Sequence, residues 1–448
     1  MLELINQYMS GVAVPILLTA CGIFYCFKLR FFHIIKFPRV MKVLTTRGEA
    51  GGTSPLKAVT LALAGTLGVG NIVGVSSAIA LGGFGAVFWM WVSALVAMLI
   101  KYAEIVLAML YRRFDSEGAP HGSAMFYIRA CFERLHLGRL GRAAAAVFAS
   151  LCLVNAFTMG SLVQMNAVGE AVEGVFGISP LLTCGALSLL ALAVILRGRG
   201  GILKFTEVIV PIMTAGYIVI SIAVLVIRAD RVGEAFALIF KNAFATSSAS
   251  AGVFGFLTSR AIRFGVMRGV ISNEAGCGTA PAAHAVSNTK SPARQGVWGI
   301  FEVFTDTIVL CTMTALVVVV GYDAASAYTE DFMMMTISAY GSALGNFASV
   351  FLALAVLFFG FATVICWAHY GAECASYFSK SQRVGGKGFS AAYCIFAFLG
   401  AFISTDTIWQ ITDFAIAAMT LINLVVLFMM SGEVKRETEL FFGSGKKK

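Results

Sequence analysis

Charged residues are scarce in this sequence of 448 residues: they make up 12%, against 59% hydrophobic residues, and the mean hydropathy is +0.86. Soluble domains carry about 25% charged residues, so the composition excludes a chain made mainly of soluble domains. At about 20 residues per span, the length leaves room for roughly ten to twelve transmembrane helices and little else. We therefore expect an all-α integral membrane protein.

Signals for disulfide, zinc and hydrolytic chemistry are missing as well. None of the ten cysteines forms a CxxC pair, and most lie inside apolar runs, so we interpret them as small core residues. The absence of HExxH and GxSxG motifs argues against an intramembrane metalloprotease or hydrolase. The N-terminus lacks the basic region of a cleavable signal, which predicts that the first apolar run is retained as a helix.

Basic residues lie between the apolar runs, and membrane topology explains the net charge of +10 better than a nucleic-acid partner does. The positive-inside rule places segment 28–49 in the cytoplasm, the N-terminus outside and the C-terminal tail inside. We predict a basic cytoplasmic turn at 197–204 and an amphipathic helix along the outer surface at 323–346. The expected eleven spans lie at 12–27, 55–80, 86–110, 143–171, 180–196, 208–227, around 272–281, and at 298–320, 347–370, 389–402 and 408–430.

Two of these spans carry helix-breaking residues. Three glycines occur within 65–70, and the stretch 272–281 combines a carboxylate, two glycines and a proline. Non-helical backbone at membrane depth is tolerated only where it is buried or lines a cavity, and transporters use such breaks to bind substrates and ions. We expect both helices to be unwound at these stretches.

The interrupted spans are the first and sixth of the ten that follow the leading helix, so each begins a unit of five. Because five is odd, the second unit enters the membrane in the opposite orientation, which predicts two inverted repeats. The expected division is a leading helix and connector at 1–50, the first repeat at 51–230, the inverted repeat at 231–432 and a cytoplasmic tail at 433–448.

Other functions compete with a transporter. A channel would need a ring of polar residues from several subunits, whereas the polar residues here lie within one chain. Steady currents without amino acid flux would favour a channel. A transporter for a different organic substrate is the closest alternative.

Several motifs resemble those of the alanine/glycine:cation symporters, also called sodium:alanine symporters. They cover nearly the whole ten-helix core, and they are Gly65-Thr-Leu-Gly-Val-Gly-Asn-Ile-Val-Gly74, Ala80-Leu-Gly-Gly, Trp89-Met-Trp-Val, Lys101-Tyr-Ala-Glu104, Arg268-Gly-Val-Ile-Ser-Asn-Glu-Ala-Gly-Cys-Gly-Thr-Ala-Pro281, Arg294-Gln-Gly and Asp306-Thr. The resemblance implies a five-plus-five inverted-repeat fold of the leucine-transporter type. It also implies Na⁺-coupled, sometimes H⁺-coupled, uptake of small neutral amino acids across the plasma membrane of a prokaryote by a monomer.

The same resemblance implies a binding site. The implied substrate ligands are Gly68, Gly70, Asn71, Gln164, Gly276, Cys277, Gly278, Thr363 and Trp367. The implied Na⁺ ligands are the carbonyls of Ala64, Leu67 and Gly360 and the hydroxyl of Thr363. The chemistry is consistent, because a buried zwitterion needs donors and acceptors, which half-helix ends and side-chain amides supply. Thr363 and Trp367 are four residues apart and share a helix face, so Trp367 would limit substrate size.

Three residues depart from the family pattern. Cys277 replaces a larger Met or Leu, Ser161 replaces Asn, and Ala362 stands where a second hydroxyl residue is common. Our hypothesis is a slightly larger pocket that admits serine, cysteine or glutamine, with H⁺ as an alternative coupling ion.

Some polar residues have competing interpretations. Asn71 is also interpretable as a helix-packing residue and Trp367 as a core aromatic. We interpret Lys101 and Glu104, one turn apart, as a structural pair or gate element in preference to a proton relay. Glu274 is either a structural clamp or part of ion coupling. No role is assigned to three further acids, Asp306, Asp406 and Asp413.

Overall fold

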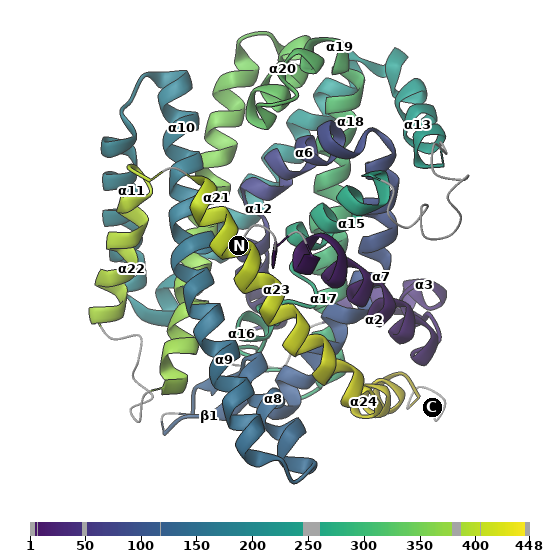
Figure 1. The fold of residues 1–448 in the computed structure, drawn as a ribbon, viewed down its shortest axis with the longest axis vertical. Helices are drawn as coiled ribbons and strands as arrows, with labels where there is room; N and C mark the ends of the chain where they lie inside the picture. The colour runs from purple at the N-terminus through teal and green to yellow at the C-terminus, as the bar shows by residue number, and fades with distance from the viewer. Residues whose placement is uncertain are drawn as a thin grey trace.

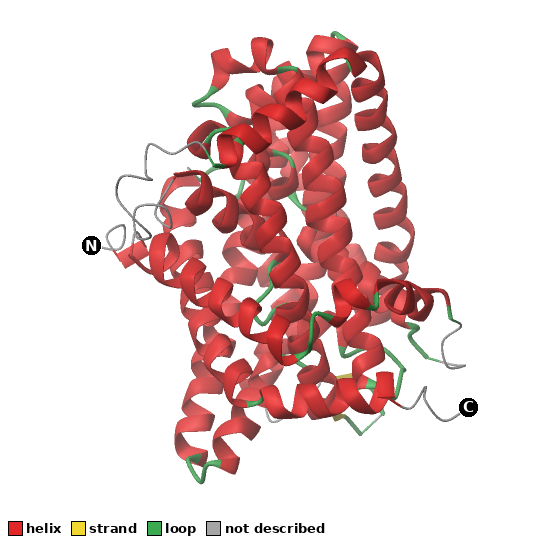
Figure 2. Ribbon diagram, turned by 90° about the vertical axis from the view of Figure 1, so that its right-hand side faces the viewer, coloured by secondary structure: helices red, strands yellow, loops and turns green. Residues whose placement is uncertain are grey.

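The computed structural model describes residues 5–46 other than 7, 52–244 other than 117, 260–378, 387–403 and 405–443. The chain is a bundle of helices whose long members run along the length of the molecule (Figures 1 and 2). Within the described residues, the only strands are β1 (Arg113–Phe114) and β2 (Pro120–His121), which pair antiparallel.

Six helical segments among the described residues are long and apolar enough to cross a membrane. They are Gly85–Tyr111, Gly138–Phe176, Gly198–Ile227, Pro292–Val320, Phe347–Phe378 and Ile408–Met429. On one of them, Val208, Ile212, Val219 and Val226 are each more than half exposed. Their spacing places them on one side of the helix, and such an apolar face suits lipid and not water. The chain is therefore a multi-pass membrane protein.

The first half of the chain begins with a leading helix beside a short basic region. Its elements are η1 (Met9–Ala13), α2 (Val14–Lys28), α3 (Phe32–Ile35), α4 (Phe37–Thr45), α5 (Pro55–Thr66), η2 (Val69–Asn71), α6 (Val73–Gly82), α7 (Gly85–Tyr111), α8 (Ala124–Arg134), α9 (Gly138–Phe157), η3 (Thr158–Val163), α10 (Gln164–Phe176), α11 (Pro180–Ile195), α12 (Gly198–Ile227) and α13 (Ala229–Ala243).

In the second half, the first described helix is short and ends at an interruption. Its elements are α15 (Arg260–Asn273), α16 (Ala280–His284), α17 (Pro292–Val303), η5 (Phe304–Cys311), α18 (Thr312–Val320), α19 (Tyr322–Ala325), η6 (Ser326–Tyr328), α20 (Phe332–Leu344), α21 (Phe347–Phe378), α22 (Lys387–Leu399), α23 (Thr405–Met429) and α24 (Ser431–Gly443). In Figure 1, α23 runs diagonally between α9 and α2 and is in contact with both.

Three helices start at a Ser-Pro pair. Ser54, Ser179 and Ser291 are the N-caps of α5, α11 and α17, and each serine oxygen accepts a backbone N–H of the first turn. A proline follows each of them at the first helical position, where its missing N–H costs nothing and its fixed φ suits the helix. These local signals set where the helices begin.

The basic turn predicted at 197–204 is wrong. Only Arg197 precedes the helix, and α12 runs from Gly198 through the whole basic stretch, so the span begins ten residues before the predicted 208. Ile202 and Leu203 are buried in the bundle, and this packing stabilises helix beyond the apolar run. A hydropathy pattern locates the apolar part of a helix and not its ends.

The segment 323–346 is also not the predicted amphipathic surface helix. Its main element, α20, packs against α6 and α21, and the hydroxyls of Thr336 and Ser76 lie 2.6 Å apart. Tyr340 is buried and its hydroxyl lies 2.7 Å from that of Ser221. The acidic residues of the segment precede α20, so the helix itself is apolar and part of the bundle.

The segment predicted as a tail contains a packed helix. Within α24, Thr438 lies 2.8 Å from the hydroxyl of Tyr102 on α7, and Glu433 accepts a hydrogen bond of 2.6 Å from Tyr111. These contacts attach the end of the chain to α7, which also lies along α15 and α17.

Candidate functional site

The first interruption separates α5 from α6. The helix ends at Thr66, residues 69–71 form one tight turn, and helix resumes at Val73. Gly68 donates its N–H to Asn71 Oδ1 at 3.1 Å. A Cβ on Gly68 would lie 3.1 Å from Thr363 Oγ1 and 3.3 Å from Gln164 Oε1. The missing side chain thus lets α10 and α21 approach the interrupted backbone closely.

Carbonyl oxygens converge on the hydroxyl of Thr363. Its Oγ1 lies 3.1 Å from Ala64 O, 3.5 Å from Leu67 O and 3.0 Å from Phe359 O. One hydroxyl proton can serve only one of these three acceptors well. Oxygens that bind a hard cation at about 2.4 Å and at right angles stand about 3.4 Å apart. The distances from this hydroxyl to Ala64 O and Leu67 O therefore fit an alkali cation, whereas the contact with Phe359 O is the usual bond of a threonine to the carbonyl four residues earlier in its helix.

Gln164 follows the π-helical turn η3 and faces the same interruption. Its Oε1 lies 3.5 Å from the N–H of Val69, and its Nε2 donates to Met159 O at 3.3 Å. π-Turns inside longer helices often occur at functional sites. The structure therefore brings Gln164, Gly68 and Thr363 together.

Asn71 connects three elements through its side-chain amide. Its Nδ2 donates to Ser272 Oγ at 3.0 Å and to Asp306 Oδ1 at 2.7 Å. Asp306 Oδ2 accepts further bonds from Ser272 at 2.8 Å and Thr307 at 2.7 Å. Asp306, which had no role in the sequence-based prediction, is therefore the anchor that joins η2 to α15 and η5. A carboxylate inside an apolar span was the available signal.

The second interruption lies between Asn273 and Ala280. Glu274, Gly276 and Gly278 have φ values of 52°, 88° and 77°, in the left-handed region that a continuing helix cannot use. A Cβ on Gly276 would lie 2.3 Å from Leu18 Cδ2, so this turn also requires close approach to α2. The second interruption, 274–279, lies inside the stretch expected from the sequence, and the first, 67–72, overlaps the expected stretch 65–70.

Side chains of two other helices take up the backbone groups freed there. Gly278 N–H donates to Glu104 Oε1 at 2.8 Å, and Gly276 O accepts from Asn423 Nδ2 at 2.9 Å. Lys101, in contrast, lies 3.2 Å from Glu302 on α17. The predicted structural pair of Lys101 and Glu104 is thus only part of the arrangement: the two interact electrostatically, while Glu104 holds the interruption and Lys101 forms its ion pair with Glu302.

Trp367 lies one turn beyond Thr363 on α21, with its ring against Gly160. A Cβ on Gly160 would be 2.3 Å from Trp367 Cβ, so only glycine allows this contact. Gly360 packs instead against Val168, at 2.6 Å from its would-be Cβ. Gly70 has no neighbour within 4 Å of its would-be Cβ among the described residues. Gly360 also lies beside Gln164, whose backbone O is 3.5 Å from the same would-be Cβ, so of these two predicted ligands only Gly70 has no such contact with the others.

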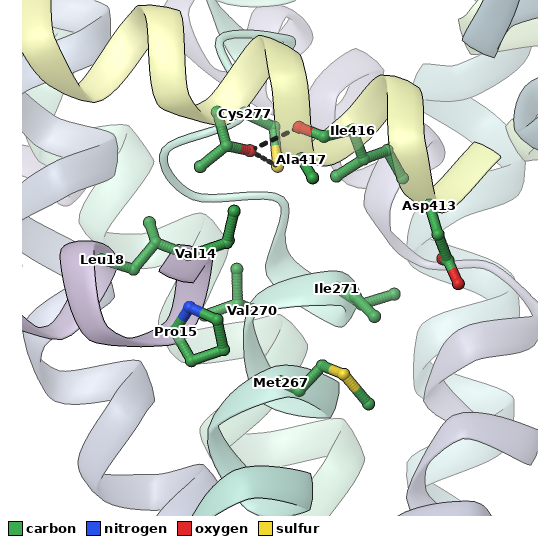
Figure 3. A pocket seen from close by; sticks show the side chains of 11 residues that line it. Val14, Pro15, Leu18, Met267, Val270, Ile271, Cys277, Asp413, Ile416 and Ala417 are labelled. Atoms are coloured by element: carbon green, nitrogen blue, oxygen red, sulfur yellow. Dashed lines mark hydrogen bonds between the residues drawn. The ribbon is translucent and has the colours of Figure 1, made fainter. Parts of the chain in front are cut away.

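Two cavities meet at Cys277. The outer one, about 40 Å³, lies between α2, α15 and α23 (Figure 3), where Thr420 Oγ1 donates to Cys277 Sγ at 3.5 Å. The inner one, about 10 Å³, is lined by Trp367, Asn155, Glu274 and Thr279 among others, and it shares Ile271, Cys277 and Ile416 with the outer cavity. These shared residues form the wall between the two cavities.

Two interrupted helices that meet at a buried polar centre, within a bundle of membrane spans, define the class as a membrane transporter. The fold has solved counterparts. MhsT in complex with L-phenylalanine matches with a TM-score of 0.57 and 12% identity, over 88% of this chain and 93% of that chain. A Na⁺-coupled sialic acid symporter matches with a TM-score of 0.54 and 12% identity, over 97% and 86%. At these identities the likeness concerns the fold alone.

The sequence identifies the family. The Sodium:alanine symporter family matches residues 1–448, and the chain belongs to it, which confirms the resemblance seen in the motifs. The chain is 38% identical over 445 residues to the sodium/alanine symporter AgcS of Methanococcus maripaludis, covering 98% of this chain and 96% of that protein.

Two relatives from Bacillus subtilis carry different descriptions. The probable sodium/glutamine symporter GlnT is 32% identical over 433 residues, covering 95% of this chain and 87% of GlnT. The putative sodium/proton-dependent alanine carrier protein YrbD is 30% identical over 437 residues, covering 94% and 88%.

Proposed function

We propose that this chain is a symporter that uses Na⁺ to carry small neutral amino acids such as alanine and glycine into the cell by alternating access. We place it as a monomer in the cytoplasmic membrane of a prokaryote, with the N-terminus outside and the C-terminus inside. Its eleven spans comprise the leading helix and two inverted repeats, 51–230 and 231–432, with the first helix of each repeat unwound. Family membership supports the coupling to Na⁺ and the class of substrate.

The observation that carries the proposal is the excess of acceptors at Thr363. Two carbonyl oxygens at the first interruption, Ala64 O and Leu67 O, lie within 3.5 Å of one hydroxyl, and its single proton also has Phe359 O, four residues earlier in the same helix, as an acceptor. A cation resolves this imbalance, and oxygen ligands without thiolates suit a hard ion. We assign the Na⁺ ligands as Ala64, Leu67, Gly360 and Thr363.

The substrate site is proposed between the two interruptions and α21. Its ligands are the residues expected from the motifs, namely Gly68, Gly70, Asn71, Gln164, Gly276, Cys277, Gly278, Thr363 and Trp367. Asn71 also has a structural role, because the oxygen and the nitrogen of its side-chain amide already form hydrogen bonds within the protein. Trp367 and Cys277 border the inner cavity and so limit the size of the substrate side chain.

A broader carrier is the second candidate. The small Cys277 side chain stands between two cavities, so movement of this wall would enlarge the pocket for serine, cysteine or glutamine. The names of GlnT and YrbD fit this alternative and coupling to H⁺, respectively.

A single Na⁺ supplies enough energy. A membrane potential of 100 mV contributes about 2.3 kcal/mol per charge, and a tenfold Na⁺ gradient adds about 1.4 kcal/mol. Together these support accumulation of several hundredfold.

The test is uptake of labelled L- and D-alanine into proteoliposomes that contain the purified chain. We expect accumulation only with an inward Na⁺ gradient, and weaker competition from serine, cysteine and glutamine than from alanine. Accumulation that follows a proton gradient and ignores Na⁺ would refute Na⁺ coupling. Failure of every small neutral amino acid to enter or compete would refute the substrate class.

A further inference from the structure

Three of the residues that line the inner cavity each carry a buried polar atom without a hydrogen-bond partner within the described part of the chain. These atoms are Glu274 Oε1, Asn155 Oδ1 and Trp367 Nε1. The three residues come from different elements, the second interruption, α9 and α21, and each is at most 3% exposed. A buried polar atom without a partner costs about 1–3 kcal/mol. Three around one cavity therefore indicate a polar ligand.

The remaining atoms of these side chains are held in place. Glu274 Oε2 accepts a hydrogen bond of 2.6 Å from Thr279, and Asn155 Nδ2 donates to Met419 Sδ at 3.3 Å. The second carboxylate oxygen and the amide oxygen are thus left for the cavity. The space of about 10 Å³ is about that of one water-sized group.

The surrounding charge favours a cation. Glu274 interacts electrostatically with Lys101, Glu302 and Asp306. Lys101 is already paired with Glu302 at 3.2 Å, and Glu302 also lies 2.8 Å from His284. Glu104 adds a further carboxylate on the other side of the interruption. Among the residues that line the inner cavity, Glu274 is the one that can carry a charge, and the nearby lysine already has Glu302 as its ion-pair partner.

We propose that the inner cavity binds the ammonium group of the substrate, with Glu274 as its counter-charge and Asn155 as a second acceptor. Trp367 Nε1 donates to the carboxylate of the same molecule, and the rest of the substrate displaces the wall at Cys277 toward the outer cavity. This inference rests on the proposed function. It restricts the substrates to amino acids with a free, charged amino group.

The experiment measures binding to the purified full chain in detergent with Na⁺, by calorimetry. The probes are L-alanine and L-lactate, which differ at the ammonium group. For the wild type we expect lactate to bind at least tenfold more weakly than alanine. In Glu274→Gln, the dissociation constant for alanine should rise by about 10- to 100-fold, as expected for a lost hydrogen bond to a charged group. The dissociation constant for lactate should change less than threefold. A purely structural role would weaken both probes alike.

Two further variants complete the design. Asn155→Leu removes the second acceptor while keeping a side chain of similar size. It should weaken alanine binding as well, by a smaller factor than Glu274→Gln. Ser188→Ala on α11 removes another buried hydroxyl without a partner in the described residues, and it should leave both probes unchanged.

The inference is overturned if Glu274→Gln keeps the preference for alanine over lactate, or if it removes only the pH dependence of binding, which would make Glu274 a proton site. If that variant does not fold, lactate that binds the wild type as tightly as alanine overturns it equally. Binding of no neutral amino acid at all would instead refute the proposed function. Alanine that binds without the Glu274 effect refutes only the inference.

Discussion

Replacing Thr363 with valine tests the proposed Na⁺ site directly. Valine has nearly the same shape, so the change removes the hydroxyl and leaves the packing of α21 against α5 intact. The carbonyls of Ala64 and Leu67 remain, at 3.1 and 3.5 Å from the position of the lost oxygen. Because one hydrogen bond is lost, we expect a fall in stability of only about 1 kcal/mol.

The effect on the ion should be larger. An oxygen that contacts a charged group contributes about 1.5–3 kcal/mol, which corresponds to a rise of roughly 10- to 100-fold in the Na⁺ concentration for half-maximal uptake. The assay is initial alanine uptake into proteoliposomes over a range of external Na⁺. Since coupling between two ligands is reciprocal, alanine affinity should fall at limiting Na⁺ and recover at saturating Na⁺.

Thr363→Ser is the matched control, because it keeps the oxygen and should stay within threefold of the wild type. A Thr363→Val variant with an unchanged Na⁺ dependence would show that the hydroxyl is not an ion ligand. Alanine affinity that stays low at saturating Na⁺ would mean that the hydroxyl contacts the substrate instead.

Two further predictions concern packing and pH. Gly160→Ala would place a methyl group 2.3 Å from Trp367 Cβ. We expect this overpacking to cost about 1–3 kcal/mol of stability, so that the unfolding temperature falls and alanine uptake is lost. A variant with normal uptake would contradict this contact. Outside the membrane spans, the hydrogen bond with Glu373 raises the pKa of His121 above its ordinary value. The stabilisation is therefore complete below about pH 6.5 and is lost as pH rises through the raised pKa. Over this pH range, the unfolding temperature of the wild type should fall relative to that of His121→Gln. If the two proteins show the same dependence of unfolding temperature on pH, this role of His121 is refuted.

The sequence predicted the parts of the site that depend on local chemistry. Glycines mark both interruptions, because an interrupted helix needs backbone conformations that other residues avoid. The four-residue spacing of Thr363 and Trp367 correctly placed both on α21, one turn apart.

Contacts between distant helices could not be predicted in this way. Lys101 was paired with Glu104 because they are one turn apart, yet its ion-pair partner is Glu302, about 200 positions away. Asp306 had no assigned role because its partners, Asn71 and Ser272, lie on other helices. Such pairs depend on how helices pack, which a single sequence does not specify, whereas periodicity describes one helix at a time.

The position of α21 offers a physical route for coupling between ion and substrate. Thr363 faces the carbonyls of α5, and Trp367, one turn further, borders the inner cavity next to the second interruption. An ion that draws α5 and α21 together would therefore also fix the wall of the proposed substrate cavity. Asn71 adds a second link, because its amide joins the first interruption to Ser272 and Asp306. If either interrupted helix moves, these contacts must break or their partners must move with it. We therefore expect Na⁺ and amino acid to stabilise the same closed arrangement.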